Sequence, residues 1–350
     1  MKTFLLLVFI LILGCSKKSP VVSSVSRVVN PDFSKLSPDC FTALSSNPVL
    51  TRNTLLAGSD WNDPSVLKLG SQFVMYASSD VNFNFDISIY RLVSSNGVTW
   101  SLSPSSPVFQ ADANGAAWDH RAVETPSVVF FNGLYHLFYS GYPANHLLPK
   151  TYKIGHATSV DGISWTRSAS FIVAPHDPNN TTPDMTFNQW ITAEPAAVVF
   201  QNKIYLYFSA LGANAGTGTD LQVIGLTTSS DGITWSAPQS VLVPNQVLYP
   251  RASWVGYSTP NAIVLNGSVH LFFDVISDPW KQVKIHHASS SDGITNWNLD
   301  SSSIFDRADF SWSSNEIRSP SVLLDGTNLF MWFAGDDGSI LSIGKSTCIL

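Results

Sequence analysis

Three acidic residues of the sequence precede prolines that open short apolar runs. Asp63 and Glu194 stand immediately before their prolines, and Glu124 stands one residue further upstream of its own. A pair of carboxyl groups is what cleavage of a glycosidic bond requires. One protonates the leaving oxygen, and the other activates water or attacks the anomeric carbon. A third acidic group nearby would raise the pKa of the acid by like-charge repulsion.

Each of these acidic residues also has an ordinary structural explanation. Aspartate, threonine and serine are common where a turn leads into a strand, and Thr259 and Ser319 occupy the place of Asp63 in two similar segments. The sequence therefore leaves Asp63 and Glu124 open between a turn role and catalysis. For Glu194 it favours a functional role, because glutamate has little reason to start a buried strand.

Aromatic and charged residues gather in the same stretches upstream of the prolines. Each of five such stretches contains a tryptophan, and we expect all five to point toward one face of the molecule. Aromatic rings stack on the apolar faces of sugars, while polar and charged groups bind sugar hydroxyls. The predicted substrate-binding residues are Asp60, Trp61, Trp118, His120, Arg121, Trp190, Trp254, Trp312 and Arg318.

The elements that carry these residues form internal repeats. Five segments share a proline, an apolar run, a turn with Gly or Asn, and a second run with alternating aromatics, which is typical of a β-hairpin. The segments begin near residues 63, 125, 194, 259 and 319, and their prolines are spaced by 62, 69, 65 and 60 residues. We refer to them below as repeats one to five.

Four of the repeats continue with a third strand, a tight turn and a short fourth strand. The turns read SSNGVTW, SVDGISW, SSDGITW and SSDGITNW, where Asn-Gly or Asp-Gly supplies the positive φ of a hairpin. We predict that their tryptophans, Trp100, Trp165, Trp235 and Trp297, pack between neighbouring sheets. Five units of four strands predict an all-β fold, a five-bladed β-propeller.

The last repeat stops after its third strand, so its fourth strand must come from elsewhere. The segment 45–53, SSNPVLTRN, resembles the fourth strand of repeat one, and we expect it to complete the last blade and close the ring. This pairing would also bring Cys40 close to Cys348. An exported protein meets an oxidising compartment, so a disulfide between them is expected, with two separate buried thiols as the alternative.

The first residues read as a targeting segment and not as part of the fold. Lys2 is followed by an apolar run over residues 4–13, which is too short to span a bilayer, and then by Gly14-Cys15. This pattern resembles a bacterial lipobox and implies cleavage before Cys15 and lipidation of its thiol; an ordinary signal peptide is the alternative. We expect residues 1–15 to be the lipoprotein signal with its lipidated cysteine, residues 16–37 a flexible tether, and residues 38–350 the propeller. The predicted location is the bacterial cell envelope.

Composition limits the classes of partner. Charged residues make up 13% of the chain and hydrophobic residues 44%, which supplies a large core and argues against disorder. The net charge of −6 gives no basic surface for a nucleic acid, so none is expected as a partner. We expect a monomer that contacts the membrane through its lipid anchor alone.

On these motifs the chain resembles the five-bladed propeller glycosidases, most closely glycoside hydrolase family 43, with families 32, 62, 68 and 117 as relatives. The resemblance covers residues from about 48 onward and rests on the five repeats, on Asn62-Asp63-Pro64 and on Glu194-Pro195. It implies that Asp63 is the general base, that Glu194 is the general acid, and that the anomeric carbon is inverted. It requires no cofactor; some members hold a calcium ion in the channel, which this sequence neither indicates nor excludes.

Repeat two departs from the family pattern. The family has an aspartate directly before this proline, where it tunes the pKa of the acid, whereas this chain has Thr125 there and Glu124 one residue earlier. Side chains of a strand alternate between faces, so the shift would turn Glu124 away from the site unless a local bulge restores it.

Two classes of function other than catalysis stay open. The main hypothesis is an exo-acting glycosidase that releases a terminal sugar such as arabinofuranose or xylose. The alternatives are a surface lipoprotein that binds glycans without cleaving them and a propeller that binds proteins, whose rim acids would be incidental. Replacing Asp63 by Asn or Glu194 by Gln would abolish hydrolysis only if hydrolysis is the function.

Overall fold

The computed structural model describes residues 30–350 except 82–85, 144–151, 181, 183, 214–219 and 278. Its regular structure is almost entirely β-strand. The described helical segments are single 3₁₀ turns of three residues each: η1 (Phe33–Lys35), η2 (Pro38–Cys40), η4 (Arg307–Asp309) and η5 (Ser311–Ser313). The predicted all-β class is therefore confirmed.

Each sequence repeat folds into consecutive antiparallel strands. Repeat one forms β2 (Asn62–Leu69), β3 (Gln72–Ser79), β4 (Ser88–Ser94) and β5 (Ser101–Leu102). Repeat two forms β6 (Ala122–Phe131), β7 (Leu134–Tyr142), β8 (Lys153–Ser159) and β9 (Thr166–Arg167). Repeat three forms β10 (Ile191–Phe200), β11 (Lys203–Ala213), β12 (Asp220–Ser229) and β13 (Gln239–Leu242).

The last two repeats follow the same plan. Repeat four forms β14 (Trp254–Leu265), β15 (Ser268–Ser277), β16 (Lys281–Ser290), β17 (Asn298–Leu299) and β18 (Phe305–Asp306). Repeat five forms β19 (Glu316–Asp325), β20 (Asn328–Asp336) and β21 (Leu341–Ile349), and β21 pairs with β1 (Thr42–Ala43). Repeats three and four share one nine-stranded sheet, in which their strands are joined by a single parallel bridge between Gln222 and Gly256.

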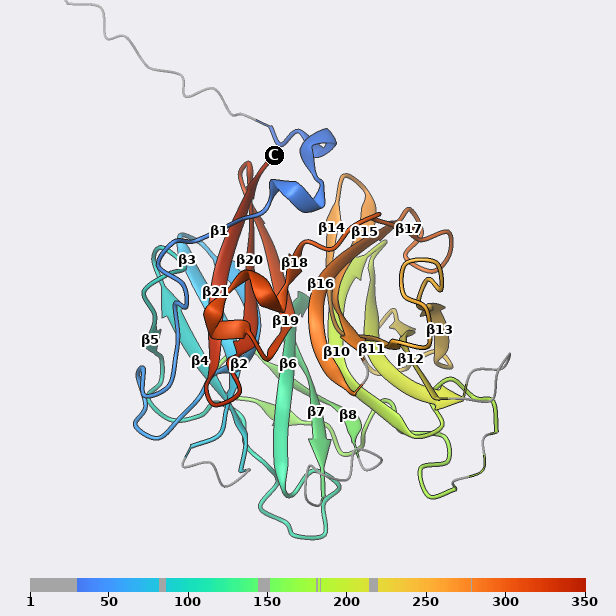
Figure 1. Ribbon diagram of the computed structural model, residues 1–350. Coiled ribbons are helices and arrows are strands. Elements are labelled where there is room, and N and C mark those ends of the chain that lie inside the picture. Colours follow the sequence, from blue (N-terminus) through green and yellow to red (C-terminus); the bar gives the residue numbers. More distant parts are fainter. Residues whose placement is uncertain are drawn as a thin grey trace, which may run out of the picture.

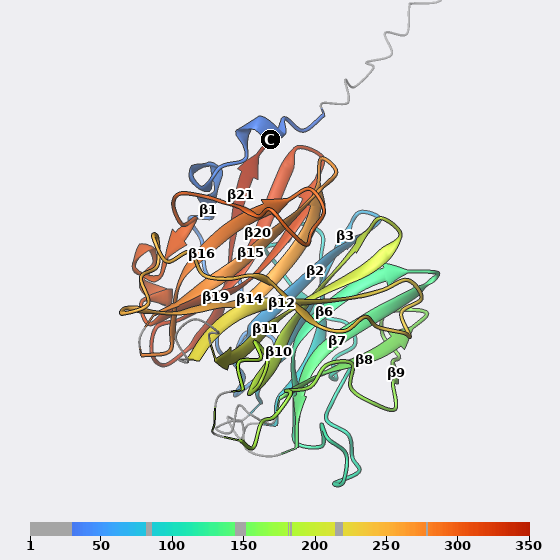
Figure 2. The same cartoon turned by 90° about the vertical axis from the view of Figure 1, so that its right-hand side faces the viewer.

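The opening strands of the repeats lie against one another in the middle of the molecule. β2 contacts β6, β6 contacts β10, β10 contacts β14, β14 contacts β19, and β19 contacts β2. Figure 2 shows β2 and β6 side by side. Backbone N–H groups bond to polar side chains of the adjacent opening strand: Val66 to Ser321 (2.9 Å), Val128 to Ser65 (3.2 Å), Ala197 to Ser127 (2.8 Å) and Val322 to Asn261 (2.9 Å).

The four tryptophans of the tight turns pack between repeats, as the sequence predicts. Each ring meets an aromatic ring on the second strand of another repeat, at centroid separations of 5.5 to 6.1 Å. The pairs are Trp165 with Tyr76, Trp235 with Phe138, Trp297 with Tyr207, and Trp100 with Trp332. Edge-to-face aromatic contacts of this kind stabilise the sheet interfaces beyond the apolar area that they bury.

The two ends of the described chain meet, as Figure 1 shows near the label C. Cys40 and Cys348 form the expected disulfide, and β1 pairs with β21. The predicted closing strand over 45–53 is shifted: the regular pairing lies at residues 42–43, and from the predicted segment Val49 and Leu50 bond to Ile343. The cis Asn47-Pro48 bond lies between these two contacts, in a stretch without regular pairing.

The predicted tether is shorter than expected at its C-terminal side. Phe33 and Leu36 pack against the buried cluster that contains Phe41 and Cys348, so residues 33–37 belong to the folded part.

The predicted lipidation site, Cys15, and the signal over residues 1–15 lie outside the described residues. Within the described part of the chain, no helix is long and apolar enough to cross a membrane.

Candidate active site

The opening strands share a backbone irregularity next to the proline that begins each repeat. The register shifts around this position in every opening strand, which marks a β-bulge. The residue before each proline has a positive φ: Asp63 (49°), Thr125 (50°), Glu194 (57°), Thr259 (37°) and Ser319 (52°). Left-handed backbone is uncommon for residues with a β-carbon and concentrates at functional sites, so these positions are candidates for function.

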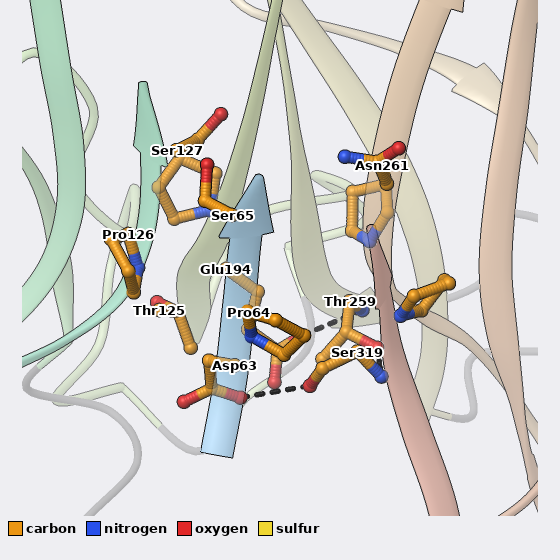
Figure 3. A pocket seen from close by; sticks show the side chains of 13 residues that line it. Asp63, Pro64, Ser65, Thr125, Pro126, Ser127, Glu194, Thr259, Asn261 and Ser319 are labelled. Carbon is orange, nitrogen blue, oxygen red and sulfur yellow. Dashed lines mark hydrogen bonds between the residues drawn. The ribbon is translucent and has the colours of Figure 1, made fainter. Parts of the chain in front are cut away.

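The bulges define two sets of side chains. The inner set consists of the five residues with positive φ, Asp63, Thr125, Glu194, Thr259 and Ser319, which all line one narrow central channel. The outer set consists of the residues one position earlier, Asn62, Glu124, Ala193, Ser258 and Arg318. Figure 3 shows the inner set gathered at one end of the channel, with Ser65, Ser127 and Asn261 further along it.

The backbone of the inner set is held by the second strands. The N–H groups of Thr125, Glu194 and Thr259 donate to serine hydroxyls at 2.7 to 3.0 Å. The N–H of Ser319 donates to the hydroxyl of Thr259 at 3.1 Å and also reaches a carboxylate oxygen at 3.5 Å. The acceptors on the second strands are Ser78, Ser140, Ser209 and Asp274, each one repeat earlier in the chain. Because each acceptor fixes a residue of the following repeat, the inner side chains have defined positions relative to one another.

Asp63 is buried and surrounded by hydrogen-bond donors. The hydroxyl of Ser319 donates to its Oδ1 at 2.8 Å, drawn as a dashed line in Figure 3. Ser78 and the backbone of Thr125 also bond to the carboxylate. Burial raises the pKa of Asp63, while Arg318 and these donors oppose the rise by favouring the charged form.

Glu194 points toward the same channel from repeat three. Its Oε2 accepts the backbone N–H of Thr259 at 3.0 Å, the second dashed contact of Figure 3, and Ser209 also bonds to the carboxylate. Burial raises the pKa of Glu194, and these two donors oppose the rise. The structure thus brings the predicted pair, Asp63 and Glu194, to the rim of one channel.

Glu124 lies beside them as a member of the outer set. The register shifts between Glu124 and Ser127, and the half-buried carboxyl of Glu124 lines one pocket with Asp63 and another with Glu194. Its pKa is raised to about 8 by burial, then by repulsion from Asp63 and from Glu194, although the side chain of Tyr152 bonds to it. Thr125 lies in the channel instead, where its hydroxyl meets that of Ser140 at 2.6 Å.

Two further charged groups complete the cluster. Arg318 bonds to Glu316 at 2.9 Å, and its positive charge lowers the pKa values of Asp63, Glu124 and Glu194. Asp274 is fully buried on β15, and its pKa is well above the usual range because of burial and the charge of Glu194. The sequence reasoning missed Asp274, although aligning the second strands places it in the column of Ser78, Ser140 and Ser209.

Three cavities meet at the carboxyl groups. The central channel has a volume of about 30 Å³, which is room for water but not for a sugar. The Asp60 pocket, of about 330 Å³, is lined by Asp60, Asn62, Asp63, Ser78, Asp80, Glu124 and Asp336, among others. The Trp280 pocket, of about 470 Å³, is lined by Glu124, Tyr152, Ile191, Ala193, Glu194, Leu211, Gln222, Ile276, Trp280 and Gln282. Both of the larger pockets are in the size range of small-molecule sites.

The predicted tryptophan rim is wrong. Trp61 and Trp190 are buried, and their Nε1 groups donate to the backbone oxygens of Thr54 (2.9 Å) and Asn180 (2.8 Å). Neither ring has a face available to a sugar.

The other three predicted tryptophans pack on neighbouring aromatic rings instead of facing a ligand. The pairs are Trp118 with Tyr139 (centroids 5.9 Å apart), Trp254 with Tyr249 (4.9 Å) and Trp312 with Phe333 (5.4 Å). Gly141 and Gly335 make this packing possible, because a β-carbon at either position would lie within 3.0 Å of a tryptophan ring. These rings are partly buried against the hydrophobic clusters, and none of them lines the two larger pockets at the carboxyl groups.

The structure places the charged residues that were predicted to bind substrate at different distances from the three carboxyl groups: some lie beside them and others line a separate pocket. Asp60 lines a pocket beside Asp63, but Arg52 holds its carboxylate at 2.6 and 2.7 Å. His120 and Arg121 line a separate pocket that contains none of the three carboxyl groups, and Arg121 pairs with Asp86 there. Only Arg318 acts on Asp63 directly, through its charge.

An exposed aromatic residue beside the carboxyl groups was not predicted. Trp280 lies in the turn between β15 and β16, with 49% of its surface exposed, and it lines the pocket that contains Glu124 and Glu194. The rim was predicted from residues upstream of each proline, whereas this turn lies at the other end of a hairpin.

Some members of the family that the sequence resembles hold a calcium ion in the channel. Calcium needs six to eight oxygen ligands, usually with several carboxylates. Among the described residues, no group of three or more His, Cys, Asp or Glu side chains is arranged to hold a metal ion. No step proposed below passes through a metal.

Comparison with known proteins identifies the fold. No protein-family model matches the chain. The chain is 25% identical over 233 residues to the uncharacterized protein Rv1502 of Mycobacterium tuberculosis, a match covering 67% of this chain and 73% of that protein.

Solved structures give a more complete match. A glycoside hydrolase aligns with a TM-score of 0.68 and 12% identity over 88% of this chain and 93% of its own. A thermostable family-43 glycoside hydrolase aligns with a TM-score of 0.61 and 16% identity, covering 84% and 91% of the two chains. A structure described as a complex of BT0996 and RGII aligns with a TM-score of 0.63 and 13% identity, covering 83% and 87%. The chain therefore has the β-propeller fold of these glycoside hydrolases.

Proposed function

We propose that this chain is a glycoside hydrolase whose catalytic groups are carboxyls at the mouth of the central channel. The observation that carries the proposal is the meeting of Asp63, Glu124 and Glu194, from three successive opening strands, around two pockets of sugar size. Glycoside cleavage needs one protonated and one ionised carboxyl group. Burial and mutual repulsion raise the pKa of Glu124 to about 8. Burial also raises the pKa of Asp63, but Arg318 and three hydrogen-bond donors oppose that rise, so Glu124 suits the protonated role and Asp63 the ionised one.

The surroundings of the carboxyl groups fit a carbohydrate. Trp280 presents an exposed ring, and the amides of Gln222 and Gln282 lie in the same pocket. An aromatic ring supplies a stacking surface, and amides bind hydroxyls in fixed directions. The solved complex of BT0996 and RGII supports a carbohydrate partner for this fold.

We extend the proposal to architecture and specificity. The cyclic order of contacts among β2, β6, β10, β14 and β19 supports a closed ring of five blades. By the resemblance to family 43, we propose exo-acting cleavage of a terminal arabinofuranose or xylose with inversion, by a monomer anchored at the bacterial cell envelope through Cys15. Chromatography of the products would show whether single sugars are released, and proton NMR of the first anomer formed would give the stereochemistry.

The central experiment uses two conservative variants with matched controls. Asp63→Asn and Glu194→Gln keep shape and hydrogen-bonding capacity but remove the charge, and should each lower kcat/KM by about 10³-fold or more on aryl arabinofuranosides or xylosides. Asp325→Asn, on the far end of β19 from the channel, should leave the rate unchanged. Circular dichroism and thermal unfolding would verify that the variants are folded.

The same variants separate catalysis from binding alone. If the wild type binds oligosaccharides on a glycan array but cleaves none of a broad glycoside panel, the non-catalytic binding function replaces the hydrolase. If it neither binds nor cleaves, a protein partner becomes the better hypothesis.

A further inference from the structure

We propose that Glu124, and not Glu194, gives its proton to the leaving oxygen, and that the scissile bond lies across Glu124 between the Asp60 pocket and the Trp280 pocket. This inference rests on the proposed hydrolase function and departs from the roles that the resemblance to family 43 implies. In that family the acidic residue of the second blade tunes the acid and does not donate the proton.

The position of Glu124 between the two pockets favours this assignment. Glu124 lines both larger pockets, whereas Asp63 lines the Asp60 pocket but not the Trp280 pocket, and Glu194 lines the Trp280 pocket but not the Asp60 pocket. A glycosidic oxygen joins two groups that occupy adjacent subsites, so its proton donor must reach the boundary between them. Of the three carboxyl groups, Glu124 is the one at that boundary.

The three carboxyl groups differ in the hydrogen-bond donors that surround them. Among the described residues, Asp63 receives hydrogen bonds from Ser319, Ser78 and the backbone of Thr125. Glu194 receives them from Ser209 and from the backbone of Thr259, which holds its Oε2 at 3.0 Å.

Glu124 is in a different environment. The side chain of Tyr152 is the hydrogen-bond partner that acts on its pKa. Backbone N–H groups can only donate, so they stabilise an ionised carboxylate and disfavour a carboxylic acid. Burial raises the pKa values of Asp63 and Glu194, and their donors oppose that rise by favouring the ionised form. Glu124 has fewer such donors and lies between the other two carboxyl groups, so it is the group best placed to keep a proton.

Charge supports the same assignment. Both neighbouring carboxyl groups raise the pKa of Glu124, which reaches about 8 even though Arg318 opposes the rise. Glu124 thus carries its proton at neutral pH, as a general acid must. Glu194, half-buried nearby, acts on Glu124 through its charge and is a positioning residue in this scheme.

The hydrolytic step balances with these groups. The terminal sugar occupies the smaller Asp60 pocket, and the leaving group lies on Trp280. As the bond from the anomeric carbon to the leaving oxygen breaks, its electron pair stays on that oxygen, which takes the proton of Glu124. Asp63 accepts a proton from a water whose oxygen bonds to the anomeric carbon. Glu124 then regains a proton and Asp63 loses one, so that water is the only reactant consumed.

Leaving-group dependence tests the assignment. Dinitrophenyl arabinofuranoside and xyloside have leaving groups that depart without a proton, whereas the corresponding methyl glycosides need one. Glu124→Gln should retain activity within about tenfold of the wild type on the dinitrophenyl substrates and lose about 10³-fold on the methyl glycosides. Glu194→Gln should not show this difference between substrates. The proposal is overturned if Glu194→Gln shows the selective loss, or if Glu124→Gln loses equally on both.

A second measurement keeps this inference separate from the proposed function. Infrared difference spectra between wild type and each variant report a protonated carboxyl group without any substrate. At pH 7 the difference between wild type and Glu124→Gln should contain a carboxylic acid band that the difference between wild type and Glu194→Gln lacks; the band of Asp274 cancels in both, because both variants keep that residue. If the Glu124→Gln difference contains no such band, the assignment fails whatever the enzyme cleaves. If the band is found as expected but no glycoside is hydrolysed, the failure is that of the hydrolase function.

Discussion

The bulge in each opening strand presents two consecutive side chains near the channel. In repeat two this places Thr125 in the channel and Glu124 at the pockets, and in repeat five it places Ser319 on Asp63 while Arg318 supplies the positive charge. The surroundings of each carboxyl group then set its charge. Burial raises the pKa of all three carboxyl groups; donors oppose the rise at Asp63 and Glu194, whereas at Glu124 repulsion from Asp63 and Glu194 adds to it.

The raised pKa of Glu124 predicts a pH dependence of stability. Its carboxyl titrates near 4.5 in the unfolded chain and near 8 in the folded protein. Between these values the folded state binds more protons, so the free energy of unfolding falls as the pH rises from about 5 to about 8. Glu124→Gln cannot titrate, and urea unfolding over this range should show a smaller decline in the variant than in the wild type. Parallel curves for the two proteins would contradict the raised pKa.

Trp280 is expected to contribute binding rather than chemistry. Trp280→Ala removes the exposed ring of the pocket that holds Glu124 and Glu194, and should raise KM about tenfold with little change in kcat. The ring supplies contact that is equal in the ground and transition states, which affects KM alone. Phe130→Ala is the control, because Phe130 is 55% exposed but lines neither pocket. An unchanged KM in Trp280→Ala would remove this residue from the substrate site.

At the scale of elements, the repeats are locked to one another by turns and second strands. Tyr76 on β3 donates to the carbonyl of Gly162 (2.6 Å), and Tyr207 on β11 donates to that of Gly293 (2.7 Å). Trp332 on β20 donates in the same way to Gly97 at 2.9 Å. Each glycine has a positive φ and belongs to an Asn-Gly or Asp-Gly turn. The turn motif therefore reverses the chain and also docks one repeat on the next.

Two glycines of repeat two allow the chain-reversing role of a turn to be measured apart from its docking role. Gly162 (φ 69°) and Gly133 (φ 83°) both need left-handed backbone, but a β-carbon at Gly162 would lie 2.6 Å from the Tyr76 hydroxyl, and one at Gly133 would meet nothing within 4 Å. Gly133→Ala should cost about 1 kcal/mol, for the backbone conformation alone. Gly162→Ala should cost about 1–3 kcal/mol more, since it also displaces a buried hydrogen-bonding hydroxyl. Urea denaturation would measure both, and equal losses would show that the docking contact contributes little.

At the scale of the whole molecule, the last sheet is built from both ends of the chain. The Cys40–Cys348 disulfide spans 308 residues, β1 pairs with β21, and Val66 bonds to Ser321 between the first and last opening strands. These contacts bring Asp63 and Ser319 together, although they are 256 residues apart. The geometry of the site thus depends on joining the chain ends.

The disulfide is expected to stabilise the fold without taking part in catalysis. A Cys40→Ala/Cys348→Ala double variant should lose about 2–5 kcal/mol of stability, because the cross-link restricts the unfolded chain. Thermal unfolding with and without reductant would measure this loss, and reductant should affect the wild type but not the variant. Hydrolysis at 25 °C should be retained, since neither sulfur lines the pockets. An unchanged Tm in the variant would show that β1 and its neighbours suffice.

The sequence by itself determined the features that depend on neighbours in the chain. Alternating apolar residues and Asn-Gly or Asp-Gly turns predicted the hairpins, and the alignment of the repeats placed Asp63 and Glu194 at equivalent positions. The same alignment led to the Cys40–Cys348 pair. These inferences hold because strand period and turn conformation are local properties of the backbone.

The tertiary structure alone decided which side chains face the site. Trp61 and Trp190 have the composition of a sugar platform but lie in the core, while Trp280, in a turn that the repeats did not single out, is exposed beside Glu124. Asp274 gains its strongly raised pKa from complete burial near Glu194. Exposure and charge state depend on what other repeats place against a residue, and a bulge of one residue reverses the direction of a side chain. Such contacts span tens to hundreds of residues, so local sequence patterns do not encode them.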